Sequence, residues 1–298
     1  MLTGITSVGA VALLSQPDLQ IGKLWFNPDA TKNTEVWEDL RALANHLHVN
    51  RKLQVSTALN TGSEHVTESE RLTIEILYPD IEIAGSGPRA GSSNRKPIST
   101  NSMSAVLRVM DQGQPIVLLP ADLDAQGLAR LANSNRPMCA PILVFPHHGG
   151  SSGGDDGAFA ERLCSIVQPD WVIFSMDRNR FRNPVPALIS GMRRAVPRVR
   201  ISCTQLSRRC SNHGSGFLRT VDRSHLEDRP AAGRSSYAAC AGTIVVRSVG
   251  SQLQFMPDAA LHQQFIMAVT QTPLCLARER DVTGEVEEPT LSLTEDSI

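Results

Sequence analysis

Residues 142–152 read Ile-Leu-Val-Phe-Pro-His-His-Gly-Gly-Ser-Ser, and residues 115–124 read Pro-Ile-Val-Leu-Leu-Pro-Ala-Asp-Leu-Asp. Each stretch contains a short apolar run, rich in β-branched residues and ended by proline, which is typical of a strand buried on both faces. Polar side chains follow each run and are expected at one end of a sheet: Asp122 and Asp124, and His147 and His148. Hydrolytic metal sites are built from carboxylates and imidazoles that gather in one place, such as the end of a sheet. The two stretches therefore predict an α/β sheet with a metal site at its edge.

The histidine pair is the strongest functional signal in the chain. Adjacent residues after a strand point in opposite directions, so one imidazole faces a cleft while the other holds its loop. We predict metal ligation by Asp122, His147 and His148, with Asp122 and His147 catalytic. Two other interpretations stay open: Asp122 caps the helix predicted over residues 126–131, or the histidines are turn residues left from an ancestral site. Asp124 is the better cap, which leaves Asp122 free for a ligand.

The segment Pro146–Ser152, together with the strand and Ala-Asp that precede it, resembles the metallo-β-lactamase fold. It is most similar to the hydrolase domain of ComEC-type DNA-uptake competence proteins. In that family a strand ending in Gly-Asp supplies a metal-bridging carboxylate, and Pro-His-His-Gly-Ser supplies a histidine ligand. Asp122 and His147 fall on those positions. Residues 101–108 are similar to the family's Asn-x-x-Ser strand, and residues 179–184 to its Asn-x-Tyr-Gly-His-Pro.

The resemblance covers about residues 10–205 and implies an αββα sandwich that hydrolyses phosphodiesters of nucleic acid with zinc or manganese. It extends to residues expected on the substrate side of the site: Ser151, Ser152, Asn179, Arg180, Arg182 and Asn183. The sequence departs from the family in three places. Asn183 replaces a histidine, Ala121 replaces the glycine before the aspartate, and the N-terminal His-x-x-x-Asp-His motif is absent, because no histidine precedes Asn45.

These departures leave too few ligands for two metal ions, which need roughly two carboxylates and several imidazoles. The sequence therefore predicts a metal-dependent hydrolase if the site is complete. The alternative is a non-catalytic, degenerate relative that keeps the fold as a binding or assembly module.

An arginine run lies between residues 178 and 209, which hold nine arginines and no acidic residue. The planar guanidinium suits phosphate oxygens, so the run predicts a nucleic-acid-binding surface. The alternative is a solvated helix face paired with acidic residues elsewhere. A protein partner is also expected for the non-catalytic interpretation.

Four of the six cysteines lie in the C-terminal part of the chain: Cys203, Cys210, Cys240 and Cys275. They could gather as ligands of a structural zinc, although their spacing matches no compact finger. The other interpretation is buried free cysteines. Irregular spacing in a chain of 298 residues argues against a disulfide framework.

Net charge and hydropathy limit where the protein can be located. The net charge is −1, and no apolar run approaches the roughly 20 residues of a membrane-spanning helix. Residues 1–14 carry no basic residue and make a poor signal peptide, so we expect a cytoplasmic protein without membrane partners. The predicted organisation is a metallo-β-lactamase-like domain over 1–205, an extension packed on it over 206–278 with a hairpin and a helix, and a disordered acidic tail over 279–298.

Overall fold

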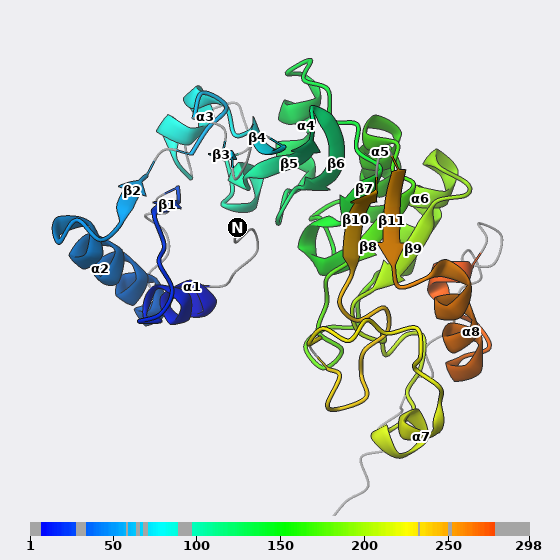
Figure 1. The fold of residues 1–298 in the computed structure, drawn as a ribbon. Coiled ribbons are helices and arrows are strands. Elements are labelled where there is room, and N and C mark those ends of the chain that lie inside the picture. Colours follow the sequence, from blue (N-terminus) through cyan, green and yellow to red (C-terminus); the bar gives the residue numbers. More distant parts are fainter. Residues whose placement is uncertain are drawn as a thin grey trace, which may run out of the picture.

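The centre of the computed structural model is a seven-stranded mixed sheet with the order β3-β4-β5-β6-β7-β8-β9 (Figure 1). The structure describes residues 7–27, 34–57, 59–63, 66–67, 71–88, 97–231, 233–249 and 252–277. The strands are β3 (Val66–Thr67), β4 (Leu72–Tyr78), β5 (Val106–Asp111), β6 (Gln114–Leu119), β7 (Ile142–Val144), β8 (Trp171–Phe174) and β9 (Arg200–Cys203). Strands β3 to β6 are antiparallel, whereas β6 to β9 are parallel.

Strand β6 belongs to both parts of the sheet, because it pairs antiparallel with β5 and parallel with β7. A tight hairpin joins β5 to β6. Its two connecting residues, Gln112 and Gly113, both have positive φ, at 51° and 78°. This backbone matches the right-handed twist of the flanking strands, which is why such two-residue turns are favoured in hairpins.

Helices α4 (Ala125–Ala132), α5 (Asp156–Val167) and α6 (Pro186–Ala195) connect the parallel strands in turn. The strand order advances in one direction, and crossovers between parallel strands are right-handed, so all three helices cover the same face of the sheet. Their apolar sides form the main hydrophobic core with that face. Helices α5 and α6 approach closely, because a Cβ atom at Gly191 would overlap the carbonyl group of Gly157.

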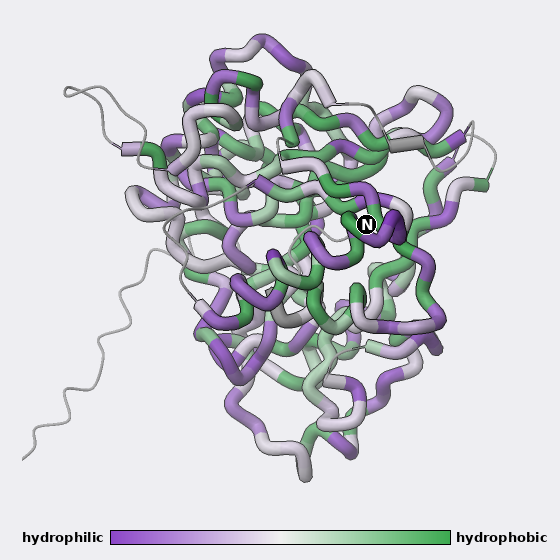
Figure 2. Tube along the Cα trace, turned by 90° about the vertical axis from the view of Figure 1, so that its left-hand side faces the viewer, coloured by the Kyte–Doolittle hydropathy of each residue, from purple (hydrophilic) through white to green (hydrophobic). Residues whose placement is uncertain are grey.

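A hairpin of β10 (Val245–Val249) and β11 (Gln252–Met256) covers β7 and β8 on the opposite face (Figure 1). The Trp171 ring packs edge-on against Phe255, with the ring centroids 5.6 Å apart. The helix layer, the large sheet and the small sheet together make a mixed α/β fold, as predicted. This arrangement is compatible with an αββα sandwich. Figure 2 shows hydrophobic segments mainly in the interior and hydrophilic segments around the outside.

The remaining C-terminal elements complete the main core beside β9. They are α7 (Ser215–Thr220), α8 (Ala259–Val269) and the 3-10 helix η3 (Leu274–Leu276). Leu206, Leu218 and Phe265 are buried in the same cluster as the residues of α4 to α6. Residues 206–277 therefore share a core with the sheet.

The N-terminal elements form a small unit of their own at the far end of the sheet. Strands β1 (Lys23–Trp25) and β2 (Gln54–Ser56) pair in parallel, and α1 (Ser7–Leu14) and α2 (Glu35–Val49) pack together. In Figure 1 they lie beyond β3, β4 and α3 (Ile81–Ser86), away from the parallel strands.

Two predicted segments differ from the observed structure. Residues 101–108 were expected as one strand, but Asn101–Met103 form the 3-10 helix η1, and β5 begins at Val106. The segment is wound because the Ser102 hydroxyl donates to Asp124 at 2.7 Å. The serine- and glycine-rich composition of residues 211–236 also predicts a surface insertion, yet Leu218 and His225 are buried. The predicted acidic tail lies outside the described residues.

Candidate functional site

Four loops meet at the edge where the parallel strands β6 to β9 end. Because parallel strands point the same way, residues that follow each of them gather on one rim, which is where ligands bind in open α/β sheets. The rim holds Asp122 after β6, His147 and His148 after β7, residues 175–183 after β8, and residues 204–209 after β9.

Asp124, and not Asp122, caps helix α4. The Asp124 side chain accepts a hydrogen bond from the Gly127 N–H at 2.8 Å, and the Ser99 hydroxyl donates to it at 2.6 Å. The prediction that Asp124 is the helix cap is therefore confirmed. Asp122 is exposed and takes no part in the cap. The preceding Ala121 has φ 51°, the left-handed conformation that favours the glycine expected from the family resemblance.

The histidine loop η2 (Pro146–Gly149) has a strained backbone. His147, His148 and Gly149 are all left-handed, with φ of 52°, 55° and 80°. The loop is held in this shape by its neighbours, since a Cβ atom at Gly149 would lie 2.6 Å from the Phe174 ring and 2.9 Å from Pro184. Backbone strain of this kind persists only where the surroundings impose it, and it clusters at functional sites.

The imidazole of His147 carries a buried nitrogen without a partner. Within the part of the chain that the structure describes, Nε2 is buried and makes no hydrogen bond. Burial lowers the pKa of His147 below its usual value, and the charge of nearby Asp122 partly opposes this shift. A neutral imidazole is the form that binds metals. His147 therefore lies within electrostatic reach of Asp122 on the rim.

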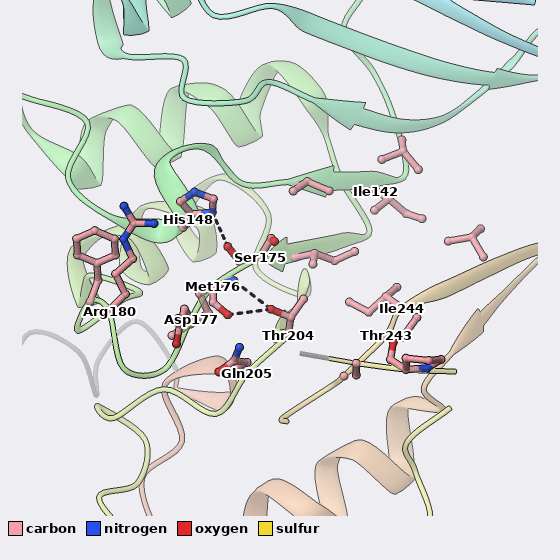
Figure 3. Close-up of a pocket in the computed structure, with 18 residues that line it drawn as sticks. Ile142, His148, Ser175, Met176, Asp177, Arg180, Thr204, Gln205, Thr243 and Ile244 are labelled. Atoms are coloured by element: carbon pink, nitrogen blue, oxygen red, sulfur yellow. Dashed lines mark hydrogen bonds between the residues drawn. The ribbon is translucent and has the colours of Figure 1, made fainter. Parts of the chain in front are cut away.

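His148 fixes the loop to the segment after the next strand. Its Nδ1 lies 2.6 Å from the carbonyl oxygen of Ser175, which follows β8 (Figure 3). The exposed His148 ring also lines the cavity described below.

Ser151 and Ser152 are held by the first turn of helix α5. Both hydroxyls donate to Asp156 at 3.1 Å, and the Ser152 backbone N–H donates to the same oxygen at 2.8 Å. Ser152 is buried, whereas Ser151 is exposed. The serines fix the position of the histidine loop in the observed structure.

Asn183 lies beside the same loop, at the position where the family has histidine. It is buried, and a Cβ atom at Gly150 would lie 3.4 Å from its Nδ2. Two residues later, the Val185 N–H donates to the Gly149 carbonyl at 2.9 Å. The segment after β8 is thus packed against the histidine loop.

The predicted arginine run divides into an internal and an external set. Arg178, Arg193 and Arg200 donate to backbone carbonyl groups inside the protein. Exposed arginines next to the site form what we call the basic rim: Arg180, Arg182, Arg208 and Arg209. Hydrogen bonds join the two loops that carry these arginines. Arg208 donates to the Asn179 side chain at 2.9 Å, and Arg209 donates to the Arg182 carbonyl at 2.6 Å.

A cavity of about 690 Å³ opens next to His148. His148, Asp177 and Arg180 lie at one end, while Ile142 and Ile244 lie at the other (Figure 3). Its volume falls in the usual range for small-ligand pockets, which combine apolar walls with a few polar groups. Sequence reasoning missed Asp177 and the apolar wall from the hairpin. The position of Asp177 just after a buried strand was the available signal for the first.

Two groups on the rim have the donor chemistry of metal ligands. The unpartnered Nε2 of His147 and the exposed carboxylate of Asp122 are donors that suit zinc or manganese. Among the described residues, no group of three or more His, Cys, Asp or Glu side chains is placed to hold a metal ion as it stands. A catalytic zinc ordinarily has three protein ligands, so this pair is one short of a full set.

Across the described ranges, none of the helices has the length and apolar character needed to cross a membrane. Comparison with known protein families gives no match, and neither does comparison with curated proteins. Among solved structures, the chain is similar to Igni18, described as a novel metallo hydrolase from the hyperthermophilic archaeon Ignicoccus hospitalis KIN4/I. The two are 12% identical, the match covers 60% of this chain and 73% of that one, and the TM-score is 0.28. A TM-score this low carries no argument about function, which rests on the geometry of the rim.

Proposed function

We propose that this chain is a metal-dependent hydrolase of phosphodiesters in nucleic acid, with Asp122 and His147 as two of the metal ligands. The observation that carries the proposal is the buried, unpartnered Nε2 of His147 beside the charge of Asp122. Leaving a buried polar atom unpaired costs about 1–3 kcal/mol. We therefore infer that a bound ligand pairs with the His147 nitrogen in this strained loop. A divalent ion bound there would supply activated water.

The basic rim supports a phosphodiester as the substrate. Its four exposed arginines flank the histidine loop, and Asn179 orients the guanidinium of Arg208 through a bond of 2.9 Å. Arginine forks match pairs of phosphate oxygens, and a row of such contacts follows a polynucleotide backbone. Arg180 lines the cavity together with His148.

Metal content and nuclease activity test the proposal together. We expect purified protein to lose one equivalent of zinc or manganese, and its hydrolysis of single-stranded DNA, on His147→Ala. The matched control is His46→Ala, which removes an exposed imidazole from helix α2 and should change neither quantity. An unchanged metal content in the His147→Ala protein would refute the proposal.

A non-catalytic binding module is the second candidate, favoured by the lack of a third metal ligand among the described residues. In that case the basic rim binds nucleic acid, and affinity falls steeply with added salt, without hydrolysis at any metal concentration. Activity that depends on His147 excludes this candidate. Salt-dependent binding with no activity and no metal at the rim establishes it instead.

A further inference from the structure

The cavity described above lies between the large sheet and the hairpin. Ile142 and Ile173 of strands β7 and β8 line it from one side, and Ile244 and Val246 line it from the hairpin side. These four side chains also pack in one hydrophobic cluster, so the two walls face each other. The opposite end of the cavity holds Arg180 (Figure 3). A ligand that fits this space therefore has two apolar faces and a negatively charged group at one end.

Hydrogen bonds between loops hold the walls of the cavity in place. The Thr204 hydroxyl accepts a bond from the Met176 N–H at 3.0 Å and donates to the Met176 carbonyl at 3.2 Å, which joins the loops after β8 and β9. On the hairpin side, the Thr243 hydroxyl donates to the Pro230 carbonyl at 2.6 Å. All four residues line the cavity. The space is therefore built into the fold, and ordering its walls costs an entering ligand little.

Gln205 offers a hydrogen-bond donor in the wall of the cavity. Its side chain is 7% exposed and lines the space together with Asp177 and Thr204 (Figure 3). The amide oxygen accepts the Arg178 N–H at 3.1 Å, and this contact fixes the other end of the amide as the NH2 group. Among the described residues, that group has no hydrogen-bond partner. Polar groups of largely buried side chains are normally paired, so an acceptor atom of a ligand fits here.

Asp177 supplies a hydrogen-bond acceptor in the same cavity. Its carboxylate accepts one bond from its own loop, the Asn179 N–H at 2.9 Å. A carboxylate has room for further hydrogen bonds. The edge of a nucleobase presents both donors and acceptors, and its two faces are apolar. Gln205 and Asp177 match such an edge, while the isoleucine-rich walls match the faces.

An exposed aromatic ring lies within the basic rim. Phe181 is 51% exposed, lies between Arg180 and Arg182 in the chain, and lines the cavity. The Arg180 guanidinium is 5.2 Å from the centroid of the Phe181 ring, which is a cation–π contact. Proteins that bind single strands combine aromatic rings, on which bases stack, with cations that bind the phosphates. Phe181 and Arg180 thus suit the two parts of one nucleotide.

We propose that the cavity is a nucleobase subsite, in which one unpaired base contacts Phe181 and bonds to Gln205 and Asp177. The inference rests on the proposed function and deepens it, because it adds contacts to a base where the basic rim contacts phosphates. The phosphate of the same nucleotide binds Arg180. A base must leave its stack and its partner to enter such a pocket, so an unpaired strand binds here more readily than a duplex.

Binding to a strand with and without bases tests the proposal. The probes are a short fluorescein-labelled single-stranded DNA and the same sugar-phosphate chain with an abasic site at every position. Both affinities are measured by fluorescence anisotropy on the full chain in EDTA. We expect the strand with bases to bind about 5- to 150-fold more tightly, which is the effect of one stacked base. Equal affinities would show that the rim contacts the backbone alone and would overturn the proposal.

Substitution of Phe181 tests the role of its ring. Phe181→Ala should lower the ratio of the two affinities by at least about fivefold, and Phe181→Trp should restore it. The matched control is Phe217→Ala, which removes another exposed phenylalanine, on helix α7 and outside the cavity lining, and should keep the ratio. A ratio that survives Phe181→Ala refutes the subsite.

Filling the cavity separates entry of the base from stacking on the outer surface. Ile244→Trp places a larger side chain in the apolar end, so the ratio should fall while the affinity for the abasic chain stays the same. An unchanged ratio in the folded variant, checked by circular dichroism, would overturn entry into the cavity.

All of these measurements are made without metal, so they do not depend on hydrolysis. A chain that shows the ratio but hydrolyses nothing with metal added would refute the proposed function alone. A chain that hydrolyses nucleic acid but binds both probes equally would refute the nucleobase subsite alone.

Discussion

Gly149→Ala should destabilise the protein by roughly 2–5 kcal/mol, because two separate costs add at this position. The residue has φ 80°, where an alanine pays about 1–2 kcal/mol for left-handed backbone. Its new methyl group would also lie 2.6 Å from the Phe174 ring. Forcing extra atoms into a packed site costs about 1–3 kcal/mol more.

A second glycine separates the two costs. Gly153 has φ 82° and nothing within 4 Å of a Cβ atom, so Gly153→Ala carries the backbone cost alone. Urea denaturation of both variants gives the free energies of unfolding, and their difference measures the steric cost at the histidine loop. If the two variants are equally stable within about 0.5 kcal/mol, Phe174 and Pro184 do not hold the loop, and the argument that its strain is imposed fails.

Three further outcomes follow from the described contacts. Asp124→Ala should lower the free energy of unfolding by about 0.5–2 kcal/mol through the lost helix cap, whereas Asp122→Ala should leave it nearly unchanged in urea denaturation. Replacing all four arginines of the basic rim with alanine should reduce the slope of log affinity for single-stranded DNA against log salt by about 3, measured by fluorescence anisotropy. The hydrogen bond from the Arg71 guanidinium lowers the pKa of Asp111 below its ordinary 3.8, so its stabilisation is present above that pH and is lost as pH falls further. The thermal midpoint of Asp111→Asn should therefore fall less between pH 5 and pH 3 than that of the wild type.

Local patterns predicted the strands that carry the rim. The apolar runs within residues 115–124 and 142–152 coincide with β6 and β7, and the hairpin and helix expected within residues 206–278 are β10, β11 and α8. These elements are fixed by their own residues: alternation or a continuous apolar run, with proline or a capping aspartate at the ends. The rim could be predicted for the same reason, since strand ends are visible in the sequence.

Contacts between distant segments could not be predicted this way. The arginine run gave no sign that Arg178 and Arg193 would turn inward, because their partners are carbonyl groups of loops far along the chain. Asn101–Met103 form a 3-10 helix because Ser102 bonds to Asp124, which is also a tertiary effect. Any ligand of the proposed metal ion beyond Asp122 and His147 would depend on contacts of this second kind.

The burial of Trp171 under the hairpin makes the fluorescence of its indole sensitive to the position of β10 and β11. Its indole is 2% exposed, sealed by Phe255 of the hairpin on one side, with the Arg200 guanidinium 3.9 Å from the ring centroid. The same hairpin supplies a wall of the cavity beside His148. Any swing of β10 and β11 away from the sheet would wet the indole and shift its emission toward longer wavelengths, so hairpin opening can be followed by fluorescence once Trp25 and Trp37 are replaced by phenylalanine.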